Sequence, residues 1–415
     1  MSTSRAKECE KFIDDAHPRE WIGGFLPLGL LLSLVGPLSI AWQYHIDTDA
    51  QQVGIDFLVL DACCLAWLTL APSCLRRISL RAAAISACAL GFSSVLGLSG
   101  LTPPMPAIWR DVDLGFIGLA AGTLLASLLY VLEPYYAEAP IRAVSVCGLL
   151  FGCGSLIAAL LVAATYFAGS VQIETALLAI VPLFFLAIYA RNRYAPARRR
   201  AMLGAELGGR ESVADVRAIA AMLFAALLFF QFGSEWAIAG WLPLFLIHRL
   251  GSNPEWAILA LALFFSILVL GRLLAFRLLS RISHRKLLVG STGIAMLGYL
   301  LLSLTDSLLA AYLAILIIGL AFAPIYPLIA ENLDERFSYQ PRFYKRIIAI
   351  AIAGAMTMQS VMGFIASYAG MQYVMLLPAL GSAAVLVLTL LIMFERHLMG
   401  DRRDKAETLI PAEKK

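Results

Sequence analysis

Charged residues are scarce in this chain. Asp, Glu, Lys and Arg make up 14% of its 415 residues, whereas about a quarter of a typical soluble domain is charged. Hydrophobic residues, in contrast, make up 60% of the chain. This balance excludes an ordinary soluble domain and is typical of an integral membrane protein.

The chain also lacks the motifs of an enzyme. Its seven cysteines have neither the spacing of metal ligands nor that of a disulfide framework, and we interpret them as small buried side chains. No glycine-rich nucleotide loop and no nucleophile with a nearby base is visible. We therefore expect no enzyme activity, no cofactor and no metal site. The net charge of +4 needs no nucleic-acid partner, because the distribution of basic residues across a membrane explains it.

Long apolar stretches are abundant. A helix needs about 20 residues to cross the roughly 30 Å hydrocarbon core of a bilayer. Twelve stretches have about this length or more, so we predict an all-α membrane protein with twelve transmembrane helices. They cover approximately residues 22–44, 53–74, 82–102, 113–133, 143–168, 173–190, 219–247, 255–277, 287–305, 308–331, 346–369 and 372–394.

The basic residues are distributed unevenly between the two sides of these helices. Of the 32 Lys and Arg residues, only Arg110 and Arg249 belong to the side that lacks both termini. Cytoplasmic loops collect Lys and Arg, so we predict that both termini are cytoplasmic. We also expect no basic residue at mid-membrane depth. The short tails and loops favour a bacterial inner membrane as the location.

An internal repeat divides the chain into two halves. At an offset of 204 residues, segment 75–81 matches segment 279–285 at five of seven positions, and four further Gly or Arg positions coincide. We predict two equivalent six-helix bundles in parallel orientation around a central cavity. The predicted units are an N-terminal tail (1–20), a first bundle (21–190), a basic linker (191–217), a second bundle (218–394) and a C-terminal tail (395–415).

Parallel repeats of this kind are typical of a large class of transporters, with the substrate site at mid-depth between the halves. Helices interrupted by Gly and Pro tend to line such sites, and we expect three of them to kink. A kink serves either gating or packing. The interrupting residues are Pro27, Gly29, Gly36 and Pro37 in the first span, Gly233, Gly240 and Pro243 in the seventh, and Pro324 and Pro327 in the tenth.

The loop after the eighth span resembles the signature of the major facilitator superfamily, Gly-x-Leu-Ala-Asp-Arg-x-Gly-Arg-Arg. The stretch from Phe276 to Lys286 follows its length, leucine and basic tail, but has Phe276, Ser280 and Ser283 where Gly, Asp and Gly are usual. The resemblance implies that this loop clamps the inner face through charge pairs. The alternative is that its arginines only fix topology. The gating candidates are Arg277, Arg281, Arg285 and, from the first copy, Arg77.

Three further segments resemble the fucose permease-like branch of sugar:proton symporters. They are residues 232–243, with a Gly-x-Glu followed by Gly-x-Trp, residues 151–154 and residues 319–327. This resemblance implies proton-coupled symport of a sugar or a similar neutral solute.

Three carboxylic acids lie within the predicted spans and are candidates for proton coupling. A carboxyl in hydrocarbon is costly and is therefore usually functional. Glu235 lies near the middle of the seventh span, and burial disfavours the charged form, so it is suited to gain and lose a proton. Asp61 and Asp56 share the second span but differ by about 140° around the helix, so only one is expected to line the cavity. We favour Asp61. Glu235 alternatively stays protonated and bonds a backbone carbonyl.

Six other residues are candidate substrate ligands together with Glu235. Aromatic rings can stack on the apolar face of a sugar, although packing between helices is the alternative for each of them. The candidates are Gln231, Trp236, Trp241, Tyr326, Tyr130 and Gln359.

The predicted function is therefore that of a secondary transporter with a small-molecule substrate and protons as its partners in the lipid bilayer, acting as a monomer. Proton-coupled sugar symport is favoured. Efflux of a cationic or amphipathic compound is the first alternative, because Phe and Met are frequent around Glu235. A sensor or scaffold that has lost transport is the alternative of another class.

Overall fold

The computed structural model describes residues 21–45, 49–75, 78–101, 106–138, 140–166, 171–191, 215–278, 283–337 and 341–408. Within these ranges the chain forms helices and short turns and contains no β-strand. Twelve of the helical segments are long and apolar enough to cross a membrane, as predicted. The chain is a multi-pass membrane protein.

The predicted spans coincide with the observed helices one for one, except that the first span is built from two helices. The helices are α3 (Phe25–Ser33), α4 (Val35–His45), α5 (Ala50–Leu75), α6 (Leu80–Leu98), α7 (Ala107–Glu138), α8 (Pro140–Thr165), α9 (Val171–Arg191), α11 (Asp215–Leu250), α12 (Pro254–Leu278), α13 (His284–Leu304), α14 (Leu308–Phe337), α15 (Pro341–Tyr368) and α16 (Leu376–Thr408), with a 3-10 turn η2 (Met371–Tyr373) before α16.

The first span breaks at Leu34, between α3 and α4. Pro37 lacks an N–H for the carbonyl of Ser33 one turn earlier, which accounts for an interruption here. The other two helices are not interrupted, and the kinks expected in them stay predictions. Helix α11 continues through Pro243, and α14 continues through both of its prolines. Neighbouring helices can accommodate the freed backbone groups of such prolines inside a bundle.

The two halves repeat the same internal packing. In the N-terminal half, α3 lies so close to α8 that a Cβ on Gly29 would overlap the carbonyl oxygen of Phe151. In the C-terminal half, α11 and α15 make the equivalent contact, because a Cβ on Gly354 would overlap the carbonyl oxygen of Phe229. Each contact joins the first and fifth spans of its half. The predicted architecture of two parallel six-helix bundles is therefore confirmed.

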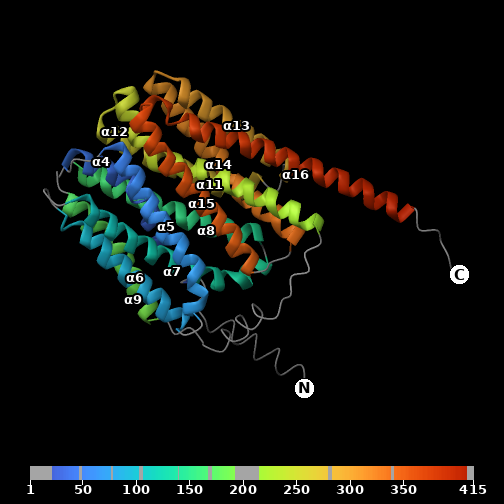
Figure 1. Ribbon diagram of the computed structural model, residues 1–415, viewed down its shortest axis with the longest axis horizontal. Coiled ribbons are helices and arrows are strands. Elements are labelled where there is room, and N and C mark those ends of the chain that lie inside the picture. The colour runs from blue at the N-terminus through green and yellow to red at the C-terminus, as the bar shows by residue number, and fades with distance from the viewer. Residues whose placement is uncertain are drawn as a thin grey trace.

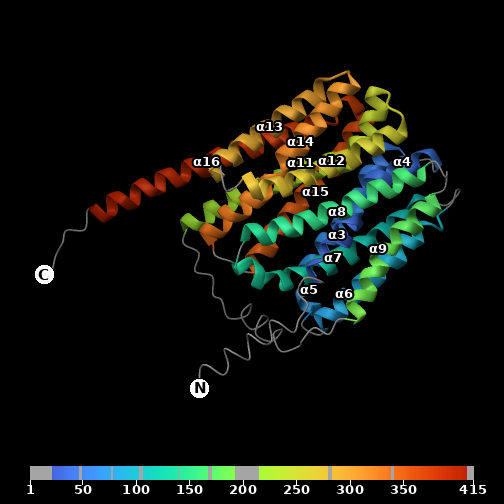
Figure 2. The same ribbon diagram turned by 180° about the vertical axis from the view of Figure 1, so that it is seen from behind.

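The outer helices of each half lie at opposite edges of the bundle. Helices α6 and α9 pack together at one edge, whereas α13 and α16 pack together at the other (Figures 1 and 2). The last helix, α16, continues beyond the span that ends at Phe394 and leaves the bundle (Figure 1).

Helices α4, α5 and α8 of the N-terminal half face α11, α15 and α12 of the C-terminal half. We call the end of the bundle that carries the basic loops the basic end, and the other the opposite end. The halves meet tightly at the opposite end. A Cβ on Gly36 of α4 would overlap the carbonyl oxygen of Ala239 in α11, and a Cβ on Gly363 of α15 would lie 2.7 Å from the Cα atom of Gly54 in α5.

Candidate functional site

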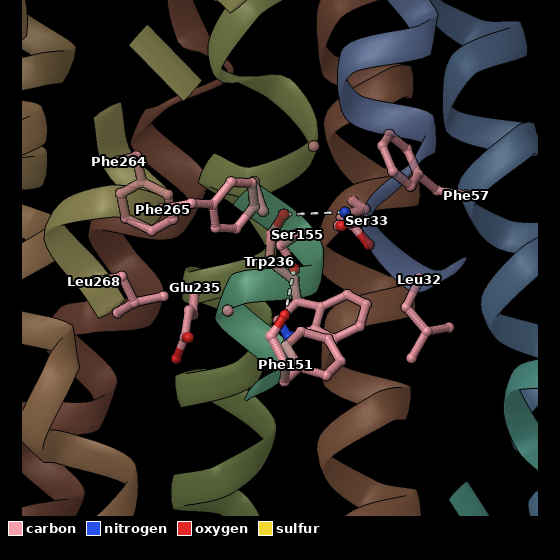
Figure 3. A pocket seen from close by; sticks show the side chains of 14 residues that line it. Leu32, Ser33, Phe57, Phe151, Ser155, Glu235, Trp236, Phe264, Phe265 and Leu268 are labelled. Carbon is pink, nitrogen blue, oxygen red and sulfur yellow. Dashed lines mark hydrogen bonds between the residues drawn. The ribbon is translucent and has the colours of Figure 1, made fainter. Parts of the chain in front are cut away.

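Two cavities lie between the halves near the middle of the helices. The main cavity has a volume of about 120 Å³ and is lined by α3, α7 and α8 of the N-terminal half and by α11, α12, α14 and α15 of the C-terminal half. The small cavity, of about 20 Å³, lies next to it toward the opposite end (Figure 3). Trp236 of α11 and Phe151 of α8 line both cavities, with their ring centroids 5.6 Å apart. This aromatic pair therefore stands between the two spaces.

An ion pair faces the main cavity. Nη2 of Arg272 in α12 donates to Oε1 of Glu235 in α11 at 3.0 Å. The side chains of Arg272 and Glu235 are 5% and 13% exposed. Among the described residues that line this cavity, no other is charged. A buried pair of this kind is strongly destabilised when one partner is removed, because the other charge is left without compensation.

Arg272 also reaches across to the N-terminal half. Its Nη1 donates to the backbone carbonyl of Gly148 in α8. A Cβ on Gly148 would lie 3.3 Å from this nitrogen, and a Cβ on Gly152 would lie 3.4 Å from it. The guanidinium thus lies in a shallow groove of α8 that exists because these two positions lack side chains.

Most of the remaining wall of the main cavity is apolar. Besides the ion pair, the described lining includes the hydroxyl of Tyr326 in α14, whose ring packs edge-on against Phe232 at 5.2 Å, and the indole N–H of Trp236. The rest of the lining is aliphatic or aromatic side chains, one cysteine and one glycine. In the small cavity, Gln359 of α15 donates from Nε2 to the carbonyl oxygen of Trp236 at 3.0 Å.

Comparison with known proteins agrees with this arrangement of two halves around a central cavity. Residues 22–351 match the Major Facilitator Superfamily. The chain belongs to the major facilitator superfamily. An uncharacterised transporter of this superfamily from Yersinia pestis is 25% identical over 169 residues, which is 40% of this chain and 43% of that protein. The chain thus aligns with less than half the length of this curated relative.

Three solved structures of transporters have a similar fold. A D-xylose–proton symporter has a TM-score of 0.71 at 14% identity, covering 90% of this chain and 96% of that one. The nucleoside transporter NupG has a TM-score of 0.65 at 15% identity, covering 91% and 98%. The superfamily transporter FucP in its outward conformation has a TM-score of 0.62 at 17% identity, covering 90% and 98%. At these identities the likeness concerns the fold alone.

Within this superfamily fold, a basic residue of a span pairs with an acid of the neighbouring span, which the sequence did not lead us to expect. Arg272 lies six residues before the end of α12 at Leu278, which places it about 9 Å along the helix from that end. In the sequence, Arg272 is followed closely by other basic residues and was therefore grouped with the basic end. Arg272 lies deeper in its span than the arginines that follow it, and Glu235 on the preceding span needs a cation as its partner. These two signals together would have identified Arg272.

Of the predicted substrate ligands, Glu235, Trp236 and Tyr326 line the main cavity and Gln359 lines the small one. For the other three, a role as substrate ligands stays a prediction. Gln231, Trp241 and Tyr130 are buried in helix contacts and line neither cavity.

Trp241 shows the physical reason for this position. It lies five residues after Trp236, which is about 140° around α11, so the two rings point to different sides. Its Nε1 donates to the carbonyl oxygen of Gln359 at 3.0 Å, and its ring lies 6.3 Å from that of Phe57. In this structure Trp241 therefore packs between helices.

Neither aspartate of the second span lines either of the two cavities, and a proton-coupling role for Asp61 stays a prediction. Asp56 is fully buried and accepts from Arg110 Nε at 3.2 Å and from Gln52 Nε2 at 3.2 Å. The guanidinium of Arg110 also lies 4.9 Å from the ring of Trp42. Asp61 is 1% exposed, and in the described part of the chain its carboxylate oxygens have no hydrogen-bond partner. Both side chains lie on a helix, α5, that packs against α7 and α15.

The predicted gating loop is only partly described. Arg285 is exposed at the start of α13. Nearby, Oε2 of Glu331 in α14 lies 2.6 Å from Nδ1 of His284. The charge clamp at the basic end therefore stays a prediction. The gating candidates outside the described part are Arg77, Arg281 and the side chain of Arg277.

Proposed function

We propose that this protein is a secondary active transporter that moves a small amphipathic solute by alternating access, with Glu235 as its proton-coupling group. The observation that carries the proposal is the main cavity. It lies between the halves at mid-depth, its wall is apolar, and it contains one ion pair. Cavities that combine apolar walls with a few placed polar groups are typical ligand sites.

The wall favours an amphipathic solute over a sugar. Each sugar hydroxyl that is buried without a partner costs about 1–3 kcal/mol. Among the described residues that line the main cavity, the polar hydrogen-bonding groups are those of Glu235, Arg272, Tyr326 and the indole N–H of Trp236, and the first two already bond each other. Sugar symport, which the sequence resemblance implies, is the second candidate. The ring faces of Trp236 and Phe151 and the amide of Gln359 support it.

Glu235 is the better candidate for the coupling proton than either aspartate. Its carboxyl faces the cavity, so its protonation can be linked directly to occupancy by a solute. Asp56 already has Arg110 as its partner, and Asp61 is buried but lines neither cavity. A group that binds a proton drives transport only if the proton changes the affinity for the solute.

The packing of the halves supports movement as rigid units. Glycine contacts fix α3 to α8 and α11 to α15 inside each half, whereas the halves meet each other at the opposite end through separate glycine contacts. The distribution of basic residues supports an extracellular opposite end and cytoplasmic termini in a cell membrane. This proposal includes the predicted domain boundaries, with bundles at residues 21–190 and 218–394 and a linker at residues 191–217.

The experiment that tests the proposal is counterflow of labelled solute in proteoliposomes, preceded by a ligand-stabilisation screen of the purified protein. The screen compares sugars, polyols, amino acids, lipophilic cations and amphipathic carboxylates at acid and alkaline pH, because a ligand of the folded state raises its melting temperature. We expect an amphipathic compound to stabilise the protein and to exchange. Binding by sugars alone would replace our first candidate by the second.

Two variants make the result specific. Glu235→Gln should abolish uptake driven by a proton gradient, whereas Glu174→Gln should not. Glu174 is a suitable control because its side chain is buried in the first turn of α9 and lines neither cavity. A protein that binds a ligand but never exchanges it would instead be a sensor, and the transport proposal would fail.

A further inference from the structure

We propose that Arg272 is the anion anchor of the main cavity, and that the transported solute is a small amphipathic carboxylate that crosses together with one proton. This inference rests on the proposed transport function and names its substrate class. It reverses the expectation that the protein prefers neutral or cationic solutes, which depended on the absence of a basic residue at this depth.

The geometry of Arg272 suits it to exchange one carboxylate for another. A guanidinium presents a planar fork of N–H donors that matches the two oxygens of a carboxylate. Nη1 is held by the carbonyl of Gly148, which fixes the plane of the group against α8. Nη2 is bonded to Glu235 and faces the main cavity. A solute carboxylate that enters the cavity therefore competes with Glu235 for the same nitrogen.

The rest of the cavity suits the apolar body of such a solute. Aliphatic and aromatic side chains from both halves surround the ion pair, among them Leu28, Leu129, Phe232 and Ile352. The cavity volume is about 120 Å³, and an engineered apolar cavity of about 150 Å³ holds a benzene molecule. The expected body is accordingly one six-membered ring or a short branched chain.

Charge balance then links the solute to a proton. In the empty transporter, Glu235 and Arg272 are ionised and cancel each other. A solute carboxylate alone would make the cavity negative, and a proton on Glu235 alone would leave it positive; either net charge is unfavourable in a site of low dielectric constant. When the solute and the proton enter together, the solute pairs with Arg272 while Glu235 is neutral. Only the empty and the fully loaded states are uncharged, so only these two change conformation readily.

In the described part of the neighbouring helices, no second group that is charged near neutral pH faces the pair. The titratable or charged groups that face the pair are Tyr326 of α14, Tyr299 of α13, and Cys147 and Cys153 of α8. All four are neutral in their ordinary state near neutral pH. Among the described residues that line the main cavity, the proton therefore goes to Glu235.

The test uses three probe carboxylates, benzoate, phenylacetate and 4-methylpentanoate, each with its amide and its amine of matching shape. We expect at least one carboxylate to raise the melting temperature more than its amide does, and to do so more strongly at pH 6 than at pH 8. In proteoliposomes, after subtraction of diffusion into protein-free liposomes, its uptake should follow an inward proton gradient. A potential imposed with potassium and valinomycin should leave the uptake unchanged, because the cargo is neutral.

Variants separate the anchor from the coupling group. Arg272→Gln should weaken carboxylate binding by on the order of 30-fold or more, as expected for the loss of a buried charge partner. Glu235→Gln imitates the protonated acid, so it should bind carboxylate equally well at both pH values and exchange it, but lose gradient-driven uptake. The double variant has no charge in the cavity, so it should fold and bind the amide at least as well as the carboxylate. Arg249→Gln, outside the cavity, should behave like the unchanged protein.

Other outcomes overturn the inference in distinguishable ways. Equal binding and exchange of amide and carboxylate would support the transport function but refute the role of Arg272 as an anion anchor. Exchange of the amine alone, strongest at alkaline pH, would mean that Glu235 binds a cation. Uptake that responds to membrane potential would refute the neutral cargo. Binding without counterflow of any solute would refute the transport function itself.

Discussion

A single methyl group at Gly363 should open the opposite end of the transporter. A Cβ at this position would lie 2.7 Å from the Cα atom of Gly54 and 3.0 Å from the carbonyl oxygen of Ala50, whereas ordinary contact begins at 3.4 Å. The obstructing atoms are backbone, so α5 and α15 must separate locally by about 0.7 Å. Overpacking of this kind costs about 1–3 kcal/mol.

This cost falls mainly on one conformation. Helices α5 and α15 belong to different halves, so the overlap exists only while the opposite end is closed. A difference of about 1–3 kcal/mol between two states changes their ratio by roughly 5–150-fold. We therefore expect Gly363→Ala to shift the population toward states in which the opposite end is open.

The assay is a distance measurement between spin labels at Ile108 of α7 and Leu309 of α14, in a variant without its native cysteines. Both positions are exposed and begin helices of different halves at the opposite end. Gly363→Ala should enlarge the long-distance population. Gly290→Ala is the matched control, because a Cβ there meets no heavy atom within 4 Å. An unchanged distribution in Gly363→Ala, together with a lower melting temperature, would refute the reasoning, since the contact would then stabilise all conformations alike.

Three further predictions concern individual side chains. Trp236→Ala should join the two cavities and weaken binding of a ring-bearing solute by about tenfold, measured as a dissociation constant, while uptake still depends on the proton gradient; loss of that dependence would assign Trp236 to coupling. Arg110→Gln should lower stability by about 3 kcal/mol or more because Asp56 is left buried without its cation, as a melting experiment in detergent can measure; an unchanged melting temperature would contradict this. Asp61→Asn should retain proton-coupled uptake in proteoliposomes, and its loss would restore Asp61 as a proton carrier.

The helices could be predicted from the sequence because hydropathy alone determines them. A segment in hydrocarbon must satisfy its own backbone hydrogen bonds, so an apolar stretch of sufficient length has few alternatives to a helix. Hydropathy does not determine at which proline a helix is interrupted. Pro37 coincides with a break, but Pro243 lies within a continuous α11, since the neighbours of a helix decide whether the freed groups are accommodated.

The candidate site could be predicted only in part. Glu235 stood out because an acid deep in an apolar span is rare, and it does line the main cavity. Asp61 met the same criterion but faces other helices, because the rotation of α5 depends on tertiary contacts that its own sequence does not specify. Arg272 was overlooked for a related reason. An arginine near a cytoplasmic end usually reaches the interface with its long side chain, and only the position of α8 and Glu235 turns this one inward.

The ion pair belongs entirely to one half of the protein. Glu235 and Arg272 both lie in the C-terminal half, whereas the N-terminal half contributes apolar side chains and the carbonyl of Gly148 to the main cavity. A carboxylate bound to Arg272 would therefore move with the C-terminal half throughout the transport cycle. The N-terminal half would slide past the solute, and the sequence of its smooth surface would control how fast the solute is released rather than which solute is chosen.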